Sequence, residues 1–80
     1  MKVYVVKERW LIECELCTQC ECSVFFTKEK ADEYAKKAAK WFCETDIEGG
    51  RYVEDSIHDY EVENDNDEWL EIDIEEKSVQ

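Results

Sequence analysis

The chain has 80 residues, which is enough for one hydrophobic core, so we expect a single domain over residues 1–80. Its 22 acidic and 10 basic residues give a formal net charge of −12. This charge excludes a nucleic-acid binder that works by neutralising phosphates, and it argues against docking on anionic membranes. It indicates a basic partner or simply a very soluble protein. The absence of proline and the 12% aromatic content favour a folded domain over a disordered acidic tail.

The first residues, MKVYVVKERWLI, contain no apolar run long enough for a signal peptide. No stretch of the chain approaches the ~20 apolar residues of a membrane span. We therefore expect a cytoplasmic protein, in which thiols stay reduced and clustered cysteines favour a metal over disulfides.

The N-terminal half predicts a β-hairpin followed by a helix. Residues 2–12 are rich in Val, Tyr, Trp and Ile and predict a strand, and residues 23–26 predict a second, antiparallel strand. Thr27 is the predicted N-cap of a helix that ends between Glu44 and Gly49. The apolar side chains of this helix follow the i, i+3, i+4, i+7 spacing of one buried stripe: Ala31, Tyr34, Ala35, Ala38, Trp41 and Phe42.

The C-terminal half predicts two more strands. Polar and apolar residues alternate around residues 59–63 and again over 70–75, while residues 64–67 read as a turn and 51–56 stay unassigned. The predicted fold is α+β, with an antiparallel sheet of about four strands and one amphipathic helix packed on it, in the order β-β-α-β-β. We expect Leu70, Ile72 and Ile74 beneath the helix.

Four cysteines lie within nine residues of the first hairpin, spaced C-x2-C-x2-C-x-C: Cys14, Cys17, Cys20 and Cys22. Two C-x2-C steps and one C-x-C step can bring four thiolates around a tetrahedral Zn²⁺. The sequence therefore predicts a zinc knuckle over residues 14–22. The zinc would be structural, because four sulfurs leave no open position for water. Reduced thiols packed as small hydrophobes, an iron–sulfur cluster and disulfides are the alternatives.

Two further candidate ligands stand apart from this cluster. Cys43 near the end of the helix is expected to be a packed thiol rather than a replacement ligand. His58, the only histidine, is expected on the strand beside Tyr60 and Val62, in a structural or exposed position.

The negative charge belongs to one half of the chain. Residues 44–76 contain 15 acidic residues and one base, Arg51, and so carry −14, while the rest carries +2. On strands, residues i and i+2 point to the same face, so two neighbouring rows of carboxylates are expected, with acidic turn residues and an aromatic anchor beside them. The predicted partner-binding residues are Glu61, Glu63, Asp65, Asp67, Glu68, Trp69, Glu71, Asp73 and Glu75. Such rows imitate the charge pattern of a nucleic-acid backbone; a solvated outer face is the simpler interpretation.

Other site types find little support in the sequence. If Glu63 were the first position of an EF-hand loop, its sixth and twelfth positions would be Glu68 and Ile74 instead of Gly and Glu. The chain has no phosphate-cradling glycine loop and no G-x-S-x-G motif, so we do not expect an enzyme.

The order KVYVV, then VFFTKEKADEYAKK, is similar to small phage and mobile-element proteins in which a hairpin runs into a T-x-E-x-A helix. With the acidic segment VENDNDEWLEIDIEE, most of the chain resembles the small anti-CRISPR proteins that inhibit type II Cas9, including an acidic, zinc-containing member. The resemblance lies in architecture and charge pattern.

This resemblance implies an inhibitor that acts in the cytoplasm of a bacterial host. Its acidic face would dock on a basic surface of Cas9, such as the recognition lobe, and stop target DNA from loading. It implies no direct nucleic-acid or membrane contact. A metal-stabilised adaptor that binds another basic host protein and a thiol metal carrier are the alternative functions.

Overall fold

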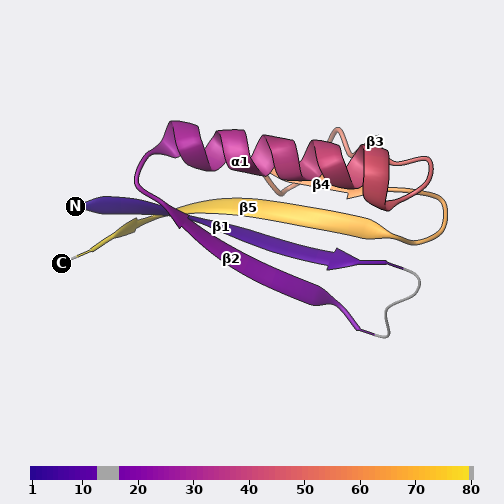
Figure 1. Cartoon of the computed structure of the whole chain (residues 1–80), viewed down its shortest axis with the longest axis horizontal. Helices are drawn as coiled ribbons and strands as arrows, with labels where there is room; N and C mark the ends of the chain where they lie inside the picture. Colours follow the sequence, from indigo (N-terminus) through magenta and orange to yellow (C-terminus); the bar gives the residue numbers. More distant parts are fainter. Residues whose placement is uncertain (13–16, 80) are drawn as a thin grey trace.

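The computed structural model describes residues 1–12 and 17–79, which form one antiparallel sheet with a single α-helix on one face (Figure 1). The strands of this five-stranded sheet lie in the order β2-β1-β5-β4-β3. The elements are β1 (Lys2–Leu11), β2 (Gln19–Phe25), α1 (Lys28–Trp41), the π-helical turn η1 (Phe42–Asp46), β3 (Arg51–Tyr52), β4 (Tyr60–Glu63) and β5 (Trp69–Ser78).

The predicted α+β class is confirmed, and the sheet has five strands where about four were expected. The additional strand is β3, which is only two residues long and lies in the segment that the sequence left unassigned. Two residues are too few to display an alternating pattern, so only their pairing with β4 identifies them as a strand.

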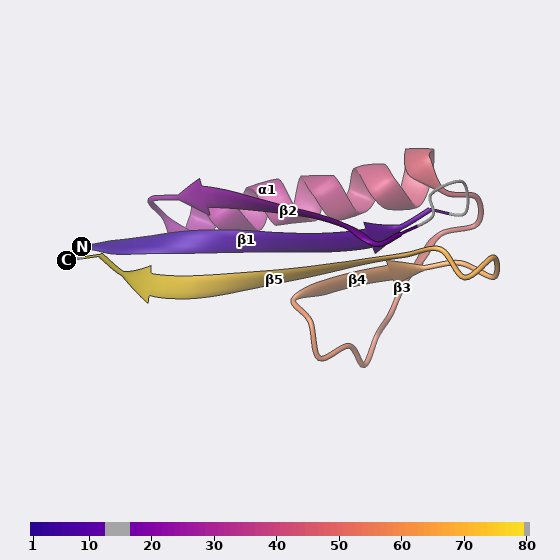
Figure 2. The same cartoon turned by 90° about the horizontal axis from the view of Figure 1, so that it is seen from below.

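The long central pair of the sheet joins the two ends of the chain. β1 and β5 are each ten residues long and pair from Lys2 opposite Ser78 to Leu11 opposite Trp69. Both termini therefore lie at one end of the sheet (Figure 2). We call the other end, which holds the α1–β3 connection and the β4–β5 turn, the distal end.

The helix begins and ends where its sequence predicts. The Thr27 hydroxyl accepts a hydrogen bond of 3.2 Å from the Lys30 backbone nitrogen, and η1 ends the helical run at Asp46. The predicted apolar stripe is wrong at Trp41, whose side chain is 64% exposed. Phe42, the next residue of the predicted stripe, is buried as expected, and the two side chains differ because successive helical residues point about 100° apart.

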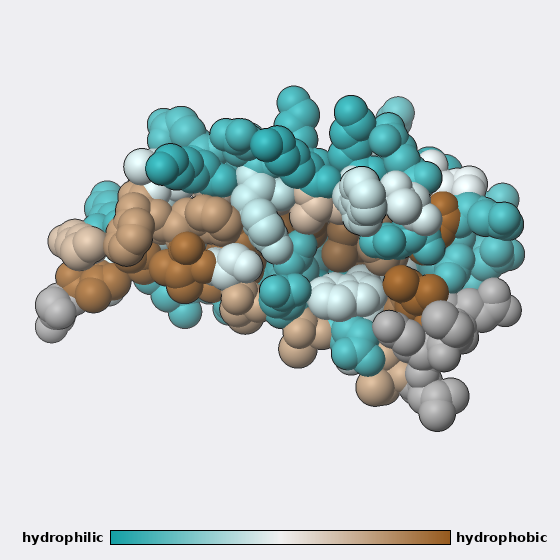
Figure 3. All heavy atoms as spheres, in the orientation of Figure 1, coloured by the Kyte–Doolittle hydropathy of each residue, from teal (hydrophilic) through white to brown (hydrophobic). Residues whose placement is uncertain are grey.

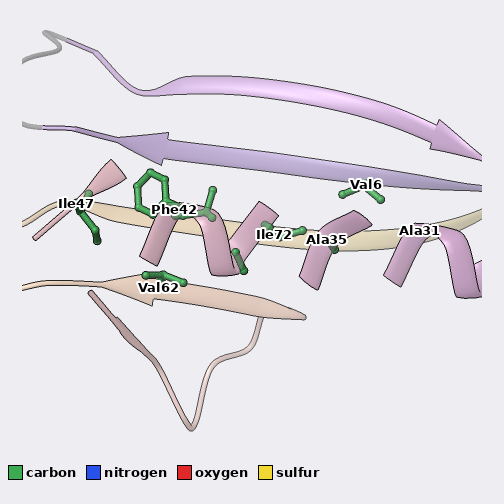
Figure 4. Packing of buried hydrophobic residues seen from close by; sticks show 9 residues of the cluster. Val6, Ala31, Ala35, Phe42, Ile47, Val62 and Ile72 are labelled. Carbon is green, nitrogen blue, oxygen red and sulfur yellow. The ribbon is translucent and has the colours of Figure 1, made fainter. Parts of the chain in front are cut away.

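The core lies between α1 and the sheet (Figure 4). Three alanines of α1 form a flat buried face that lets the helix lie close to the strands, and Phe42 and Ile47 close the distal end. As expected, Leu70 and Ile72 are buried beneath the helix, and Ile74 is half-buried. The buried apolar residues are Val6, Ala31, Ala35, Ala39, Phe42, Ile47, Val62, Leu70 and Ile72.

The predicted turn at residues 64–67 is held together by one buried side chain. Asn64 accepts hydrogen bonds from the backbone nitrogens of Asn66 and Glu68 at 3.0 and 3.1 Å. Its amide nitrogen donates to the Glu48 carbonyl at 2.9 Å and to Glu68 Oε1 at 2.7 Å. Asn64 thus fastens the β4–β5 turn to the loop that follows η1. Within the described residues, no helix is long and apolar enough to cross a membrane.

Candidate partner-binding site

The predicted carboxylate rows lie on the face of the sheet opposite α1, which we call the open face. Leu70 and Ile72 point toward the helix, so the alternate residues Glu71, Asp73 and Glu75 point away from it. Glu61 lies directly opposite Glu71 in the β4–β5 register. Two neighbouring acidic rows are therefore present, as the alternation predicts.

Basic side chains from β1 lie beside the longer row and neutralise most of it. Arg9 Nη2 is 2.6 Å from Glu71 Oε1, and this hydrogen bond raises the pKa of Arg9. Lys7 Nζ is 3.0 Å from Glu75 Oε1 and holds the pKa of Glu75 below its usual value. Lys7 and Arg9 pair with β5 in register, so each base faces an acid across the two strands.

The open face is nearly neutral overall. Lys77 and Arg51 add salt bridges of 3.7 Å to Glu75 and Glu63, respectively. The strands thus present five carboxylates against four bases on this face, which leaves about one negative charge. The five carboxylates are Glu61, Glu63, Glu71, Asp73 and Glu75, and the four bases are Lys7, Arg9, Arg51 and Lys77. The rows are a ladder of ion pairs and not a bare anionic surface.

His58 lies in the loop before β4, so the predicted strand position is wrong. Its side chain is 17% exposed and spans two members of the acidic row. Nδ1 is 2.8 Å from Asp73 Oδ2, and Nε2 is 3.2 Å from Glu71 Oε2. The hydrogen bond to Asp73 raises the pKa of His58, although burial opposes this shift. The backbone departs from strand geometry here because the Ser56 hydroxyl accepts a bond from the His58 nitrogen.

The other predicted partner-binding residues differ in exposure. Asp65 and Asp67 are exposed in the β4–β5 turn, and Asp65 is 3.0 Å from Arg51. Glu68 was expected to extend the acidic patch, but it is only 8% exposed and does not. Trp69 is half-buried opposite Leu11 on the open face.

Exposed carboxylates gather instead at the distal end. They come from η1, the loop after it and the β4–β5 turn, which the Asn64–Glu48 hydrogen bond holds side by side. We call this set the acidic end: Glu44, Asp46, Glu48, Asp65 and Asp67. Within the described part of the chain, Asp65 is the only one of these five that has an ion pair.

A hollow of about 370 Å³ borders the acidic end, between α1 and the β1–β2 hairpin. It lies where β2 diverges from α1 toward the distal end (Figure 1). Its aromatic and aliphatic wall consists of Trp10, Tyr34, Ala38, Trp41, Phe42 and Leu70, and its carboxylates are Glu8, Glu21 and Asp46. In Figure 3, a band of hydrophobic and near-neutral residues follows this side of the molecule below the hydrophilic outer surface of α1.

Glu8 is the deepest of the carboxylates in the hollow. It is 6% exposed, and its Oε2 accepts a hydrogen bond of 3.1 Å from the Tyr34 hydroxyl. Burial raises the pKa of Glu8, and the bond from Tyr34 partly opposes this shift. The sequence contains a signal for this position, because Glu8 stands between Val6 and Trp10 in the alternation of β1 and so faces the helix. A hollow with aromatic walls and several carboxylates suits the alkyl chain and cationic head of an Arg or Lys side chain.

Two of the four clustered cysteines lie on the edge strand β2, and a third lies just before it. Cys20 and Cys22 are exposed on β2, where they share one face opposite Arg9 and Lys7, and Cys17 is exposed before the strand. Cys14 lies outside the described residues. In the described part, the thiols of Cys17, Cys20 and Cys22 do not come within 4.8 Å of one another as a group of three. A four-thiolate zinc site therefore stays a prediction.

Cys43 is a packed thiol, as expected. It is partly buried against the core, and a Cβ added at Gly50 would lie 3.1 Å from its Sγ.

The chain matches no protein-family model, and no curated protein or solved structure is significantly similar to it.

Proposed function

We propose that this protein is a non-enzymatic inhibitor that binds a basic, nucleic-acid-binding surface of a partner protein and keeps nucleic acid away from it. Cas9 is the partner that the resemblance implies, and its positively charged channel for the guide–target heteroduplex is a surface of the required kind. The mechanism is steric and electrostatic, without bond making or breaking.

The observation that carries this proposal is the aromatic hollow beside the acidic end. Trp41 is 64% exposed at the rim of the hollow, and Asp46 belongs both to its lining and to the acidic end. Interface hot spots are rich in Trp and Arg, and aromatic faces attract guanidinium groups. An Arg of the partner can place its alkyl chain against Trp41 and its charge near Asp46 or Glu21.

The distal end is a better docking surface than the predicted acidic rows. Glu71 and Glu75 already have basic partners within the chain, so a partner's Arg or Lys would have to displace Arg9 or Lys7. At the acidic end, Glu44, Asp46 and Glu48 have no ion pair among the described residues, and their field is free to steer a basic partner.

The test is a pull-down with Cas9, with and without guide RNA, followed by a DNA-loading assay. Trp41→Ala and Asp46→Lys are each expected to weaken binding at least roughly tenfold, a loss typical of hot-spot residues. Glu33→Lys is the matched control, because it makes the same charge change on the exposed outer surface of α1. Binding is also expected to fall as salt rises.

Different failures of this test have different meanings. Full binding by both Trp41→Ala and Asp46→Lys would refute the distal end as the docking site. Absence of binding to every Cas9 tested would refute Cas9 as the partner and favour an adaptor for another basic protein.

A structural zinc held by Cys14, Cys17, Cys20 and Cys22 is the second part of the proposal. The donor set supports it, because soft thiolates suit Zn²⁺ and because Cys20 and Cys22 share one face of β2. Elemental analysis of protein purified without added metal is expected to give about one zinc per chain. Protein without metal in which all five cysteines react as free thiols would exclude this site. Rapid exchange of the zinc, with no loss of fold, would instead favour a metal carrier.

A further inference from the structure

Three metal-ligating side chains from three separate segments meet on the open face. They are His58 in the β3–β4 loop, Glu61 in β4 and Glu71 in β5. One ligand atom from each lies within 4.8 Å of the other two, and all three residues are half-buried. Within the described residues, no other set of three His, Cys, Asp or Glu side chains meets this condition.

The distance between two of these atoms suits a single ion. Two ligand atoms at ~2.1 Å from a tetrahedral ion lie ~3.4 Å apart, and two adjacent ligands of an octahedral ion lie ~3.0 Å apart. The distance from His58 Nε2 to Glu71 Oε2 is 3.2 Å, between these two values.

Neighbouring groups hold the ligands in orientations that metal sites require. Asp73 contacts Nδ1 of His58 at 2.8 Å and leaves Nε2 directed toward Glu71. A carboxylate on the second ring nitrogen is the usual support of a metal-bound histidine. The Ser56 hydroxyl donates to Glu61 Oε1 and Arg9 donates to Glu71 Oε1, so the second oxygen of Glu61 and the Glu71 Oε2 atom beside His58 Nε2 remain for an ion.

The local charge balance also suits a divalent cation. Glu61, Glu71 and Asp73 carry three negative charges, and Arg9 returns one positive charge. With neutral His58 the cluster has a net charge of −2. A dication neutralises this charge, whereas a proton on His58 neutralises only half of it.

We propose that His58 Nε2 and the free oxygens of Glu61 and Glu71 bind a Zn²⁺ ion on the open face. One imidazole and two carboxylates are a ligand set that Zn²⁺ accepts, and three protein ligands leave a coordination position for water. This site is separate from the cysteines and independent of the proposed function. The ion fastens the loop that projects beyond the β3–β4 edge (Figure 2) to the middle of the sheet.

The single histidine makes a direct test in the full-length protein straightforward. Because His58 is the only histidine of the chain, its two ring ¹⁵N signals report this site whatever the cysteines bind. Zn²⁺ added in excess over the five cysteines is expected to shift the Nε2 signal strongly and to leave Nδ1 in its hydrogen-bonded state. Added Zn²⁺ is also expected to slow amide exchange in residues 56–61.

Variants separate a metal site from a simple histidine ion pair. Glu61→Gln is expected to weaken the zinc affinity reported by His58 at least roughly tenfold. Glu75→Gln is the matched control, since it removes a charge from the neighbouring β5 row outside the cluster. Amide spectra establish that each variant is folded. If Glu61→Gln does not fold, Ser56→Ala takes its place, because it removes the hydrogen bond that holds Glu61. Ring signals that stay unchanged in excess zinc, or equal affinity in Glu61→Gln and Glu75→Gln, would overturn the proposal.

Discussion

Replacing Glu8 by glutamine is expected to stabilise the fold at neutral pH. Glu8 is 6% exposed and faces the helix from β1, opposite Ile72. Burial raises the pKa of its carboxyl group above the ordinary value of 4.5. A carboxyl group with a raised folded-state pKa stabilises the fold below its unfolded pKa, and this contribution is lost as pH rises through the folded-state value.

The magnitude follows from the loss of one poorly compensated buried charge. Glutamine keeps the shape of the side chain and can still accept the hydrogen bond from Tyr34. A buried polar group without full compensation costs about 1–3 kcal/mol, and the bond from Tyr34 offsets part of that cost. We expect a gain of about 1 kcal/mol at pH 7, or roughly 4–8 °C in Tm for a domain of this size, and almost none below the ordinary pKa of glutamate.

Urea denaturation followed by tryptophan fluorescence measures this difference, and the three tryptophans supply the signal. The experiment compares Glu8→Gln with the wild type at pH 7 and pH 4, and Glu33→Gln on the exposed helix surface is the control. The gain is expected only at pH 7 and only for Glu8→Gln. A variant that is less stable than the wild type at pH 7 would refute the reasoning, because the ionised carboxylate would then be stabilising. The same substitution removes a charge from the hollow, so partner binding is expected to weaken while stability rises.

Two further substitutions test how the distal end is held together. Asn64→Ala removes the side chain that joins the β4–β5 turn to residue 48. We expect it to lower the free energy of unfolding, determined by urea denaturation, by about 2–3 kcal/mol. Asn66→Ala, at an exposed position, is expected to change stability by about 0.5 kcal/mol or less, and an equal loss in both variants would contradict this role of Asn64. Gly50→Ala would place a Cβ 2.7 Å from the Cys43 carbonyl oxygen, so we expect it to lower Tm more than Gly49→Ala does. Gly49→Ala meets no atom within 4 Å and carries only the cost of about 1 kcal/mol for its φ of +64°. Thermal denaturation gives the Tm of both variants. A lower Tm for Gly49→Ala than for Gly50→Ala would show that the loop shifts at Cys43 and relieves the close contact.

Local sequence patterns determined the elements that depend on neighbours along the chain. The Thr27 cap, the burial of Ala31 and Ala35 and the alternation around Ile72 each follow from the repeat of a helix or strand and were predicted correctly, whereas the buried Ala39 was not in the predicted stripe. The acidic rows were likewise predicted, because alternation alone decides that Glu71 and Asp73 share a face.

Tertiary structure decided which groups meet across the sheet. The pairing of β1 with β5 brings Arg9 to Glu71 over a separation of 62 residues, and it converts predicted anionic rows into a ladder of ion pairs. The splay of β2 from α1 leaves Trp41 at the rim of a hollow, although the helical repeat had assigned it to the core. Strand order and the angle between layers depend on how all the apolar faces pack together, and no local repeat specifies them. The sequence therefore determined where the negative charges lie along the strands, and the packing decided which of them remain available to a partner.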